Sequence, residues 1–436
     1  MRYRLDSTWW RLGSVVLAGS PLRLFRTTDA GRRVAERLDA GADVDPSPLT
    51  DRLLDAGAIH PVPDADGGRF DVDDVTVVTP QLRRRPDEPT FTDGRIVVDD
   101  GSTPPIPGAA VRLAATQGPG AARNAGRPCV TTPLIAFVDA DVDLGADPTV
   151  WLGPMLGHFD DDAVGLVAPR VLGEHGSPLD LGDEPARIRA GTRVSYVPGA
   201  ALVVRVAAFD AVGGFDPSLR FGEDVDLVWR LDEAGWRCRY EPAASVWHEP
   251  RHAVVPRLRQ HAHYGTSAAP LALRHPGALA PARCNGWTAS AWLALAVGHP
   301  IAAATLAIGS AAALRLDGVP RRVAFGLALR GHVVAGRQFA QAVRRAWWPI
   351  VVCAAVVSRR ARRVAVASVL LDWRAAPTDI AYGWGVWTGM WRHRTAAPIA
   401  PAISSWPRRE RSGTSPRPRA RLRAVVPPRG PGASGG

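Results

Sequence analysis

The sequence predicts an α/β fold of the Rossmann-like kind, with a largely parallel sheet, over residues 73–270. Short apolar runs alternate there with stretches of helical character, and continuous Val, Ile and Leu runs are typical of strands buried on both faces. Acidic residues follow two of these runs directly, at the edge where an open α/β sheet binds its ligands. The predicted strands are VTVVT (75–79), RIVV (95–98), LIAFV (134–138), AVGLVA (163–168) and ALVV (201–204).

A small separate module is predicted for residues 1–72. Two short strands flank the Gly-Ser-Pro turn at 19–21, two short helices end at Gly41 and Gly57, and the strand AIHPV follows. A hairpin with two small helices is the outline of a winged-helix-like module. It is similar to the peptide-recognition domains of peptide-modifying systems, and a packing appendage is the alternative interpretation.

An apolar helical, membrane-associated region is predicted for residues 271–395. Residues 285–314 carry no Asp, Glu, Arg or Lys. A bilayer span needs about 20 mostly apolar residues, so this stretch is long enough for one, interrupted at His299-Pro300. The shorter runs 346–357 and 364–371, with Arg clusters between them, indicate interfacial or re-entrant helices. A soluble Ala-rich bundle is the alternative. The Arg-, Pro- and Gly-rich tail, 396–436, is expected to be disordered.

Charge and cysteine content bear on compartment and partners. The formal net charge is +11, every basic residue is Arg, and residues 391–436 hold ten Arg against one Glu. Such a tail suits an anionic membrane surface or a nucleic acid. Four widely spaced cysteines form no metal-binding pattern and fit a reducing compartment. The short apolar run SVVLAG is not a convincing signal peptide. We therefore expect the protein at the cytoplasmic face of the cell membrane.

The segment FVDADVDLGADP, 137–148, places three carboxylates on alternate residues directly after an apolar strand. Side chains alternate along an extended chain, so Asp139 and Asp141 lie on one side. Hard oxygen ligands of this kind hold Mg²⁺ or Mn²⁺, which bridges substrate phosphates. The sequence therefore predicts a divalent metal that holds a nucleotide diphosphate. A solvated acidic turn is the alternative.

Two further clusters fit a nucleotide-sugar site. In VVDDGS, Asp99 and Asp100 end a strand, where a carboxylate can accept hydrogen bonds from a uracil or a ribose. In GPGAARNAG, two glycines precede a helix start that carries Arg123 and Asn124, and free N–H groups with a cation suit a diphosphate. Taken alone, an ordinary turn and a Gly-capped helix are the alternatives.

A candidate general base lies in GGFDPSLRFGEDVDLVWRL. Helical spacing of the apolar residues begins there, and Glu223 and Asp224 lie at the helix start. The helix dipole favours the ionised form at that end. An ionised carboxylate facing a sugar acceptor can take the proton of its hydroxyl. A simple N-terminal cap is the alternative role for Asp224.

In this order, VVDDGS, GPGAARNAG, FVDADV, FGEDVDLVWRL and a later His resemble the family 2 glycosyltransferases, which have the GT-A fold. The resemblance covers about 73–265. It implies that Asp100 contacts uracil, that Asp139 lies near the ribose and that Asp141 ligates the metal.

The same resemblance implies that Asp224 is the catalytic base and that His248, in VWHEP, contacts the metal or the diphosphate. Two departures stand out. The first strand runs into VTPQLRRRPDE instead of P-x-Y-N. The Q-x-x-R-W element of processive members is replaced by QHAHY at 260–264, which argues against a long-polymer synthase.

The segment GSPLRLFRTTDAG, the unusual first-strand loop and the apolar C-terminal region together resemble the glycosyltransferases of mycofactocin systems. That resemblance implies transfer of a hexose, glucose, from a UDP-sugar to the peptide-derived redox cofactor mycofactocin or its precursor. Direct displacement with inversion is the expected mechanism. A membrane glycosyltransferase acting on a lipid or cell-wall acceptor is the alternative. A basic nucleic-acid-binding protein is a remote one, and no nucleic-acid partner is expected because the site is acidic.

Overall fold

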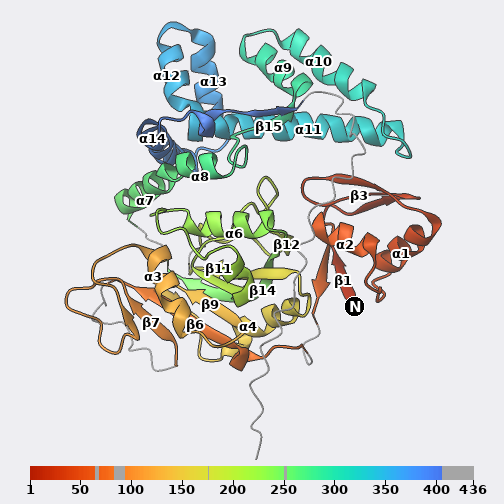
Figure 1. Cartoon of the computed structure of the whole chain (residues 1–436). Coiled ribbons are helices and arrows are strands. Elements are labelled where there is room, and N and C mark those ends of the chain that lie inside the picture. Colours follow the sequence, from red (N-terminus) through yellow and green to blue (C-terminus); the bar gives the residue numbers. More distant parts are fainter. Residues whose placement is uncertain (64–67, 83–93, 175, 250–252, 405–436) are drawn as a thin grey trace, which may run out of the picture.

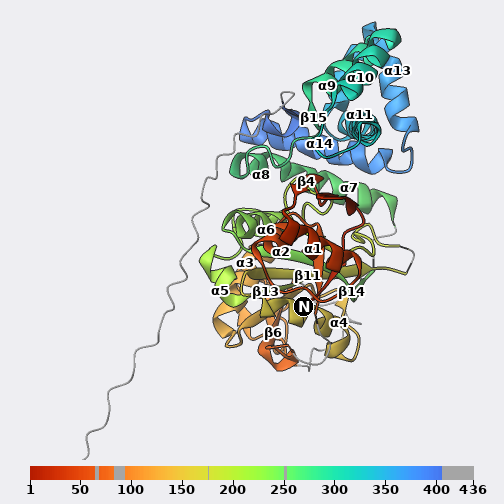
Figure 2. The ribbon, with the colours of Figure 1, turned by 90° about the vertical axis from the view of Figure 1, so that its right-hand side faces the viewer.

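The computed structural model describes residues 1–63, 68–82, 94–174, 176–249 and 253–404. Figure 1 shows three parts: a small N-terminal module, a sheet domain covered by helices, and a helical region that lies across the top of both. Figure 2, turned by 90°, shows the same order, with α7 and α8 between the sheet domain and the remaining C-terminal helices.

The N-terminal module has the predicted hairpin and two small helices. Thr28 and Ser47 cap the two helices, because each side chain accepts a hydrogen bond from a backbone N–H in the first turn. The apolar faces of both helices pack on the strands in a core that includes Leu38, Leu53 and Ile59. The elements are β1 (Arg2–Leu5), β2 (Trp10–Leu12), β3 (Val15–Ala18), β4 (Arg23–Arg26), α1 (Asp29–Asp39), α2 (Pro48–Asp55) and β5 (Ile59–Val62).

The sheet domain is the predicted α/β fold. Its central sheet has the order β10-β14-β11-β13-β9-β6-β7-β8, and β12 pairs with β14. The pairs β9–β6, β6–β7 and β7–β8 are parallel, whereas β13 runs antiparallel to both of its neighbours. Two apolar cores cover the two faces. All five predicted strands are present, as β6, β7, β9, β11 and β13.

The bounds of this domain's elements follow the chain. The strands are β6 (Val75–Gln81), β7 (Ile96–Asp99), β8 (Val111–Arg112), β9 (Leu134–Val138), β10 (Val142–Asp143), β11 (Val164–Leu172), β12 (Ala186–Arg187), β13 (Ala201–Arg205) and β14 (Arg237–His248). The α-helices are α3 (Pro119–Gly126), α4 (Pro148–Leu156), α5 (Val206–Ala211) and α6 (Glu223–Glu233). Short 3₁₀ turns are Val72–Asp74, Arg127–Cys129 and Gly157–Asp160.

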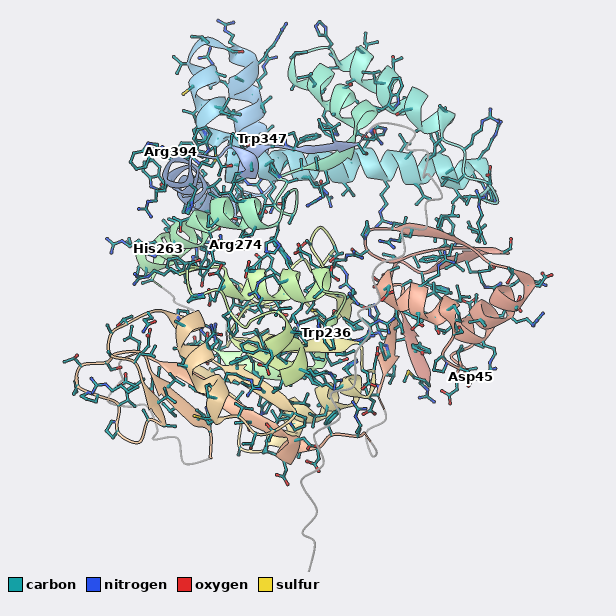
Figure 3. The ribbon with its side chains drawn as sticks, in the orientation of Figure 1. Asp45, Trp236, His263, Arg274, Trp347 and Arg394 are labelled. Carbon is teal, nitrogen blue, oxygen red and sulfur yellow. The ribbon has the colours of Figure 1, made fainter. Side chains whose placement is uncertain are left out.

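The C-terminal region is helical, as predicted. Its elements are α7 (Val254–Thr266), α8 (Ala268–Arg274), β15 (Arg283–Asn285), α9 (Gly286–Ala296), α10 (Pro300–Ala313), α11 (Arg321–Ala342), a π-helical turn (Val343–Trp347), α12 (Trp348–Val357), α13 (Arg359–Leu370), α14 (Ala376–His393), a 3₁₀ turn (Ala397–Ile399) and β16 (Ala402–Ser404). Arg274, at the end of α8 and labelled in Figure 3, joins this region to the sheet domain. Its guanidinium donates to Asp216 at 2.8 Å.

One expectation for this region is confirmed and two are corrected. The interruption predicted at His299-Pro300 is present, because Gly298 has φ +86° and Pro300 starts a new helix, so α9 and α10 fold back as a hairpin. Within the described ranges, no helix is both long and apolar enough to cross a membrane. The tail is ordered further than predicted: β16 pairs with β15, and the carbonyl of Ile399 accepts from Trp347. The predicted disorder beyond residue 404 lies outside the described residues.

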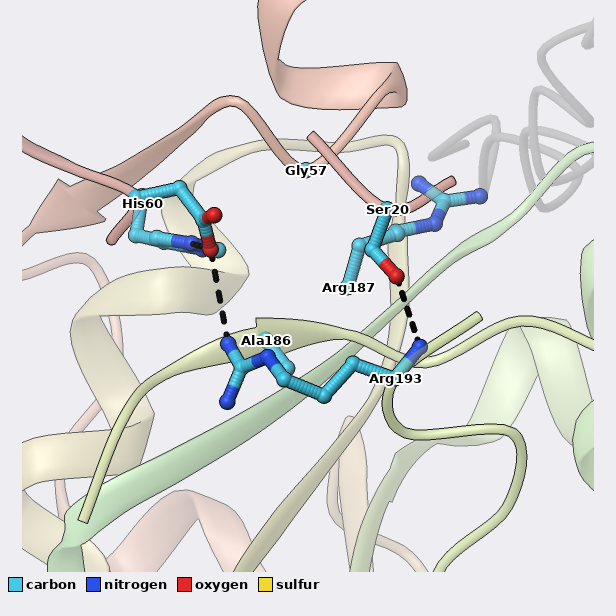
Figure 4. A pocket seen from close by; sticks show the side chains of 7 residues that line it. Ser20, Gly57, His60, Ala186, Arg187 and Arg193 are labelled. Atoms are coloured by element: carbon cyan, nitrogen blue, oxygen red, sulfur yellow. Dashed lines mark hydrogen bonds and ion pairs between the residues drawn. The ribbon is translucent and has the colours of Figure 1, made fainter. Parts of the chain in front are cut away.

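The N-terminal module docks on the sheet domain through polar contacts. The buried carboxylate of Asp6 lies 3.1 Å from His60 and 3.4 Å from Arg193, which belongs to the sheet domain. The backbone N–H of Arg193 donates to Ser20 at 2.7 Å (Figure 4). Arg237 adds ion pairs across the same boundary, to Asp55 of the module at 3.0 Å. These contacts hold the N-terminal module in one position against the sheet domain.

Candidate active site

The candidate site lies at the carboxyl end of β9. Asp139 follows that strand, and its backbone N–H donates to the carbonyl of Ala200 at 2.9 Å, just before β13. Helix α6 begins at Glu223 and brings Asp224 to the same place. Arg123, on α3, completes the group. The structure thus brings together four of the predicted site residues, at the sheet edge where such folds bind ligands.

Arg123 is the centre of this group. Its guanidinium donates to Asp139 at 2.5 Å and to Glu223 at 3.0 Å. A third bond goes to the carbonyl of Gly199 at 3.1 Å. Burial alone would lower its pKa, but the charges of Asp139 and Glu223 raise the pKa above its usual value. Both terminal nitrogens are therefore engaged by the protein, and a contact of Arg123 with the donor diphosphate stays a prediction.

Asp224 is held in place by backbone N–H groups. Its Oδ2 accepts from Gly199 at 2.8 Å, and its Oδ1 accepts from Val225 at 2.8 Å. Gly222 precedes the helix in the left-handed region, with φ +77°, so the chain turns sharply to start α6. Burial raises the pKa of Asp224 above its usual value. Burial and then the charge of Asp224 raise the pKa of Glu223 to about 7.

Asp141 and His248 form the candidate metal corner. Strand β10 pairs Val142 with His248 at the end of β14, so His248 Nε2 lies 3.5 Å from Asp141 Oδ2. The side chain of Asp141 is 48% exposed, which leaves it accessible to an ion. Burial raises the pKa of Asp139 on the neighbouring turn, and the charge of Asp141 adds to that rise.

A divalent ion fits this corner in part. Within the described ranges, no group of three or more His, Cys, Asp or Glu side chains is arranged to hold a metal ion. Mg²⁺ is commonly bound by one or two carboxylates together with water and substrate phosphates, however. A carboxylate and an imidazole side by side therefore suit an ion whose other ligands come from the donor.

Three other predicted site residues are bonded to backbone. Asp99, fully buried, accepts from Ser102 at 2.7 Å. Asp100 accepts from Gln117 and Gly118, at 2.8 and 2.9 Å, and so fixes the loop that leads into α3. The side chain of Asn124 exchanges two hydrogen bonds with the backbone of Phe215, at 2.8 and 2.9 Å. They organise the site's loops, and their contacts with a nucleotide sugar stay predictions.

Gly199 is a site residue that the sequence analysis missed. A methyl group there would lie 3.2 Å from Arg123 Nη2 and 3.2 Å from Asp224 Cβ, so a larger residue would push both side chains away by a few tenths of an ångström. The sequence offers only a Pro-Gly pair before the strand ALVV, which reads as an ordinary turn.

An aromatic group beside the base was also missed. Phe221, two residues before Glu223, stacks on His263 of α7 with ring centroids 5.3 Å apart. Tyr264 meets the edge of the same ring at 6.3 Å, and Gln260 donates to the Tyr264 hydroxyl at 2.6 Å. The QHAHY segment thus packs against Phe221, just before the start of α6.

The parallel strands, the reversed β13 and the carboxylates at the carboxyl edge define a glycosyltransferase of the GT-A fold. Residues 100–264 match the family model described as glycosyltransferase like family 2. The chain belongs to glycosyltransferase family 2, and it is a transferase enzyme. The predicted family, fold class and enzyme class are thereby confirmed.

Individual relatives give the extent of the similarity. The chain is 38% identical over 461 residues to the pre-mycofactocin glycosyltransferase of Mycobacterium tuberculosis, covering 90% of this chain and 95% of that protein. It is 42% identical over 106 residues to an N-acetylglucosaminyl-diphospho-decaprenol L-rhamnosyltransferase of the same organism, covering 23% and 34%. A solved mannosyltransferase of Pyrobaculum calidifontis, in complex with GDP-Man and Mn²⁺, has a TM-score of 0.43 at 16% identity, covering 76% and 89%.

Proposed function

We propose that this enzyme transfers a hexose, glucose, from a UDP-sugar to pre-mycofactocin, a peptide-derived redox cofactor precursor. The observation that carries the proposal is the extent of its similarity to the pre-mycofactocin glycosyltransferase, which covers 90% of this chain. An alignment of that length includes parts of the N-terminal module and of the C-terminal helical region as well as the sheet domain. By contrast, the match to the rhamnosyltransferase covers only 23% of this chain.

The proposed mechanism is direct displacement with inversion. Asp224 accepts the proton of the acceptor hydroxyl on its carboxylate, while the N–H groups of Gly199 and Val225 stabilise its ionised form. Arg123 holds Asp139 and Glu223 on either side of the base. The acceptor oxygen then attacks the anomeric carbon from the face opposite the departing diphosphate.

The proposed metal would be held by Asp141, with His248 beside it. When bound, Mn²⁺ or Mg²⁺ neutralises charge on the departing nucleoside diphosphate. Asp139, on the preceding turn, is oriented by Arg123 and is proposed to contact the ribose. This division of roles accounts for two carboxylates, Asp139 and Asp141, that would otherwise repel each other across a short turn.

Two substitutions test these roles. Asp224→Asn should lower kcat for hexose transfer to the acceptor, followed as UDP release, by about 10³-fold, because the amide cannot take a proton. Its donor affinity should stay near wild type in isothermal titration calorimetry with UDP and Mn²⁺. Asp141→Asn should lose metal-dependent UDP binding as well as turnover. Near-normal turnover of Asp224→Asn would show that another group is the base.

A matched control lies in the same acidic run. Asp143 is exposed, and its side chain caps the turn by accepting from Gly145 at 2.8 Å. Asp143→Asn should therefore keep turnover and UDP affinity. If Asp143→Asn lost as much activity as Asp141→Asn, the loss would come from removing negative charge from the acidic segment and not from removing a metal ligand.

The acceptor needs its own experiment. Purified enzyme, Mn²⁺ or Mg²⁺ and UDP-glucose are incubated with a small-molecule extract of a host strain that lacks this gene. Mass spectrometry should find hexose added to a small peptide-derived compound in step with UDP release. Sugar found only in the lipid fraction would replace the proposed acceptor with a lipid or cell-wall one, while the site assignment would remain.

We further propose that the enzyme lies at the cytoplasmic face of the cell membrane. Among residues 250–371 the sequence has 16 Arg and one acidic residue, Asp317. Large apolar side chains are exposed at the turns of the α9–α10 and α12–α13 hairpins, notably Ile301, Val356 and Val357 at 82%, 77% and 86%. Exposed apolar side chains with nearby cations suit the interface of an anionic bilayer.

A further inference from the structure

A second cavity, of about 460 Å³, lies where the N-terminal module meets the helical region. Its volume falls within the ~300–1,000 Å³ that ligand pockets occupy. Leu22 and Leu24 of the module form one wall, and Leu314, Leu327 and Val334 form part of the other. No residue of the candidate active site lines it, so it is a separate site.

The two walls are joined by a shared apolar core. Val15 of β3 packs with Val319 and Ala324, which flank the start of α11. Arg26 of β4 adds an exposed ion pair to Asp317 at 2.8 Å. The boundary is therefore a formed interface, and the cavity is a half-open pocket between its two walls.

The deep side of the cavity is neutral. His332 is buried between two hydroxyls, with Nδ1 2.9 Å from Thr288 Oγ1 and Nε2 3.0 Å from Ser310 Oγ. Burial lowers the pKa of His332, so the imidazole carries no charge at neutral pH. Its ring nitrogens are bonded to these hydroxyls. Asn285 and Gln338 also line the cavity, and their side-chain oxygens accept from the backbone N–H groups of Thr288 and Arg283. Leucine is the most frequent residue among the others that line it. This end suits an apolar group.

The outer side of the cavity is cationic. Arg23 and Arg283 line it and are exposed. Arg283 Nη2 donates to the carbonyls of Gly277 and Ala278, at 2.5 and 2.7 Å, and its guanidinium lies beside Gly191 of the sheet domain. In the part of the chain that the structure describes, neither side chain forms an ion pair, and no Asp or Glu lines the cavity. Two uncompensated guanidinium groups suit a phosphate or a carboxylate.

We propose that this cavity binds a single-chain anionic amphiphile. Its apolar chain lies among the leucines towards His332, and its phosphate or carboxylate group is bound by Arg23 on the cationic side of the cavity, which Arg283 also lines. Because the walls come from two parts of the molecule, the ligand also stabilises their contact. The site is independent of the nucleotide-sugar site and of the identity of the acceptor.

Dodecyl phosphate, used below its critical micelle concentration, is the probe. Isothermal titration calorimetry with the full chain, without nucleotide sugar, should give saturable binding of one molecule. Inorganic phosphate and dodecyl maltoside each supply one half of the probe's chemistry, and each should bind at least about tenfold more weakly. Inorganic phosphate lacks the apolar chain whose burial drives binding, and dodecyl maltoside lacks the charged hydrogen bonds to arginine. Equal binding of inorganic phosphate would overturn the proposal in favour of a simple anion site.

Variants place the probe in the cavity. Arg23→Ala should weaken dodecyl phosphate about tenfold, and the bulky Ala328→Trp, on the α11 wall, should abolish its binding. Arg33→Ala, an exposed arginine of the same module that does not line the cavity, is the matched control and should bind as wild type. Undiminished binding to Ala328→Trp, with an unchanged circular dichroism spectrum, would overturn the assignment. So would an equal loss in Arg33→Ala.

Discussion

Glu223 and Asp224 share one counter-charge, and this sets the protonation state of the candidate site. Burial and then Asp224 raise the pKa of Glu223 to about 7, and burial raises the pKa of Asp224. Arg123 is the buried cation that faces them, and it also binds Asp139. A pair of this kind holds a proton at a pH where ordinary carboxyls are ionised. Asp224 can therefore accept a proton from the acceptor hydroxyl only after the pair has lost the proton that it holds.

This coupling predicts a pH effect of Glu223→Gln. In the wild type, kcat/KM for UDP release should fall as the pH drops below about 7. The amide removes a like charge next to Asp224 and leaves Arg123 to the remaining carboxylates, so the pKa of Asp224 falls. The acid limb of the pH–rate profile should therefore move to lower pH, by about 1 unit.

The measurement is initial rate against pH at fixed metal and acceptor. Asp143→Asn, which alters a nearby exposed carboxylate, should leave the acid limb where it is. An unmoved limb in Glu223→Gln, with activity otherwise retained, would mean that the two carboxyls titrate independently.

At this scale the sequence predicted residue types better than contacts. The run Asp139-Ala140-Asp141 and the acidic helix start could be recognised, because chemistry limits which residues serve there. The hydrogen bonds of Asp100 to the loop before α3 could not, because its partners are backbone groups without a sequence signature. Gly199 was also missed. Its lack of a side chain lets Arg123 and Asp224 approach the loop closely, and that approach depends on the tertiary fold and not on local sequence.

At the scale of elements, the buried strands were the most predictable. Each of the five apolar runs predicted as strands in the sheet domain formed a strand, since both faces of a covered sheet require apolar side chains. Strand β14 lacks that signal, because Arg237 and Arg239 interrupt it. Arg237 lies at the boundary with the N-terminal module, where it pairs with Asp55 of the module and with Asp161 of the sheet domain. The pattern of β14 reflects contact between parts of the molecule, which local sequence does not reveal.

At the scale of elements we also predict that the α9–α10 and α12–α13 hairpins contact the membrane. Their turns lie close together, since a methyl group at Gly298 would be 3.1 Å from Arg360 Nε. The double variant Val356→Asp with Val357→Asp places two charges on adjacent apolar positions of that surface that are 77% and 86% exposed. Each charge should oppose insertion, so co-sedimentation with vesicles containing anionic lipid should fall by at least about tenfold.

A matched variant separates insertion from charge. Val150→Asp alters a valine that is 62% exposed on α4 of the sheet domain, and it should sediment with vesicles as wild type does. Both proteins should keep UDP release in solution. Equal sedimentation of the double variant and the wild type would remove the hairpins from the proposed membrane contact.

At the scale of the whole molecule, the N-terminal module is held by two different kinds of contact. Towards the helical region the contact is apolar, through Val15 and Val319. Towards the sheet domain it is charged and buried, with Asp6 between His60 and Arg193. The sequence predicted a separate module because its helix signals are local. How it docks depends on side chains nearly 190 positions apart, and no local pattern encodes that.

The buried Asp6–His60 pair predicts that docking weakens in acid. Burial lowers the pKa of His60, whereas the unfolded imidazole titrates near 6.5, so the unfolded state gains a proton first as the pH falls. Stability from this group is therefore full above pH 6.5 and is lost below it, by at most about 1.4 kcal/mol at pH 5.5. The wild-type melting temperature should drop between pH 7.5 and 5.5 by roughly 2 °C more than that of His60→Gln, whose amide still reaches Asp6. Differential scanning calorimetry measures both, and His158, whose pKa burial also lowers, is present in both proteins and cancels in the comparison. An identical drop in the two proteins would show that His60 does not link docking to pH.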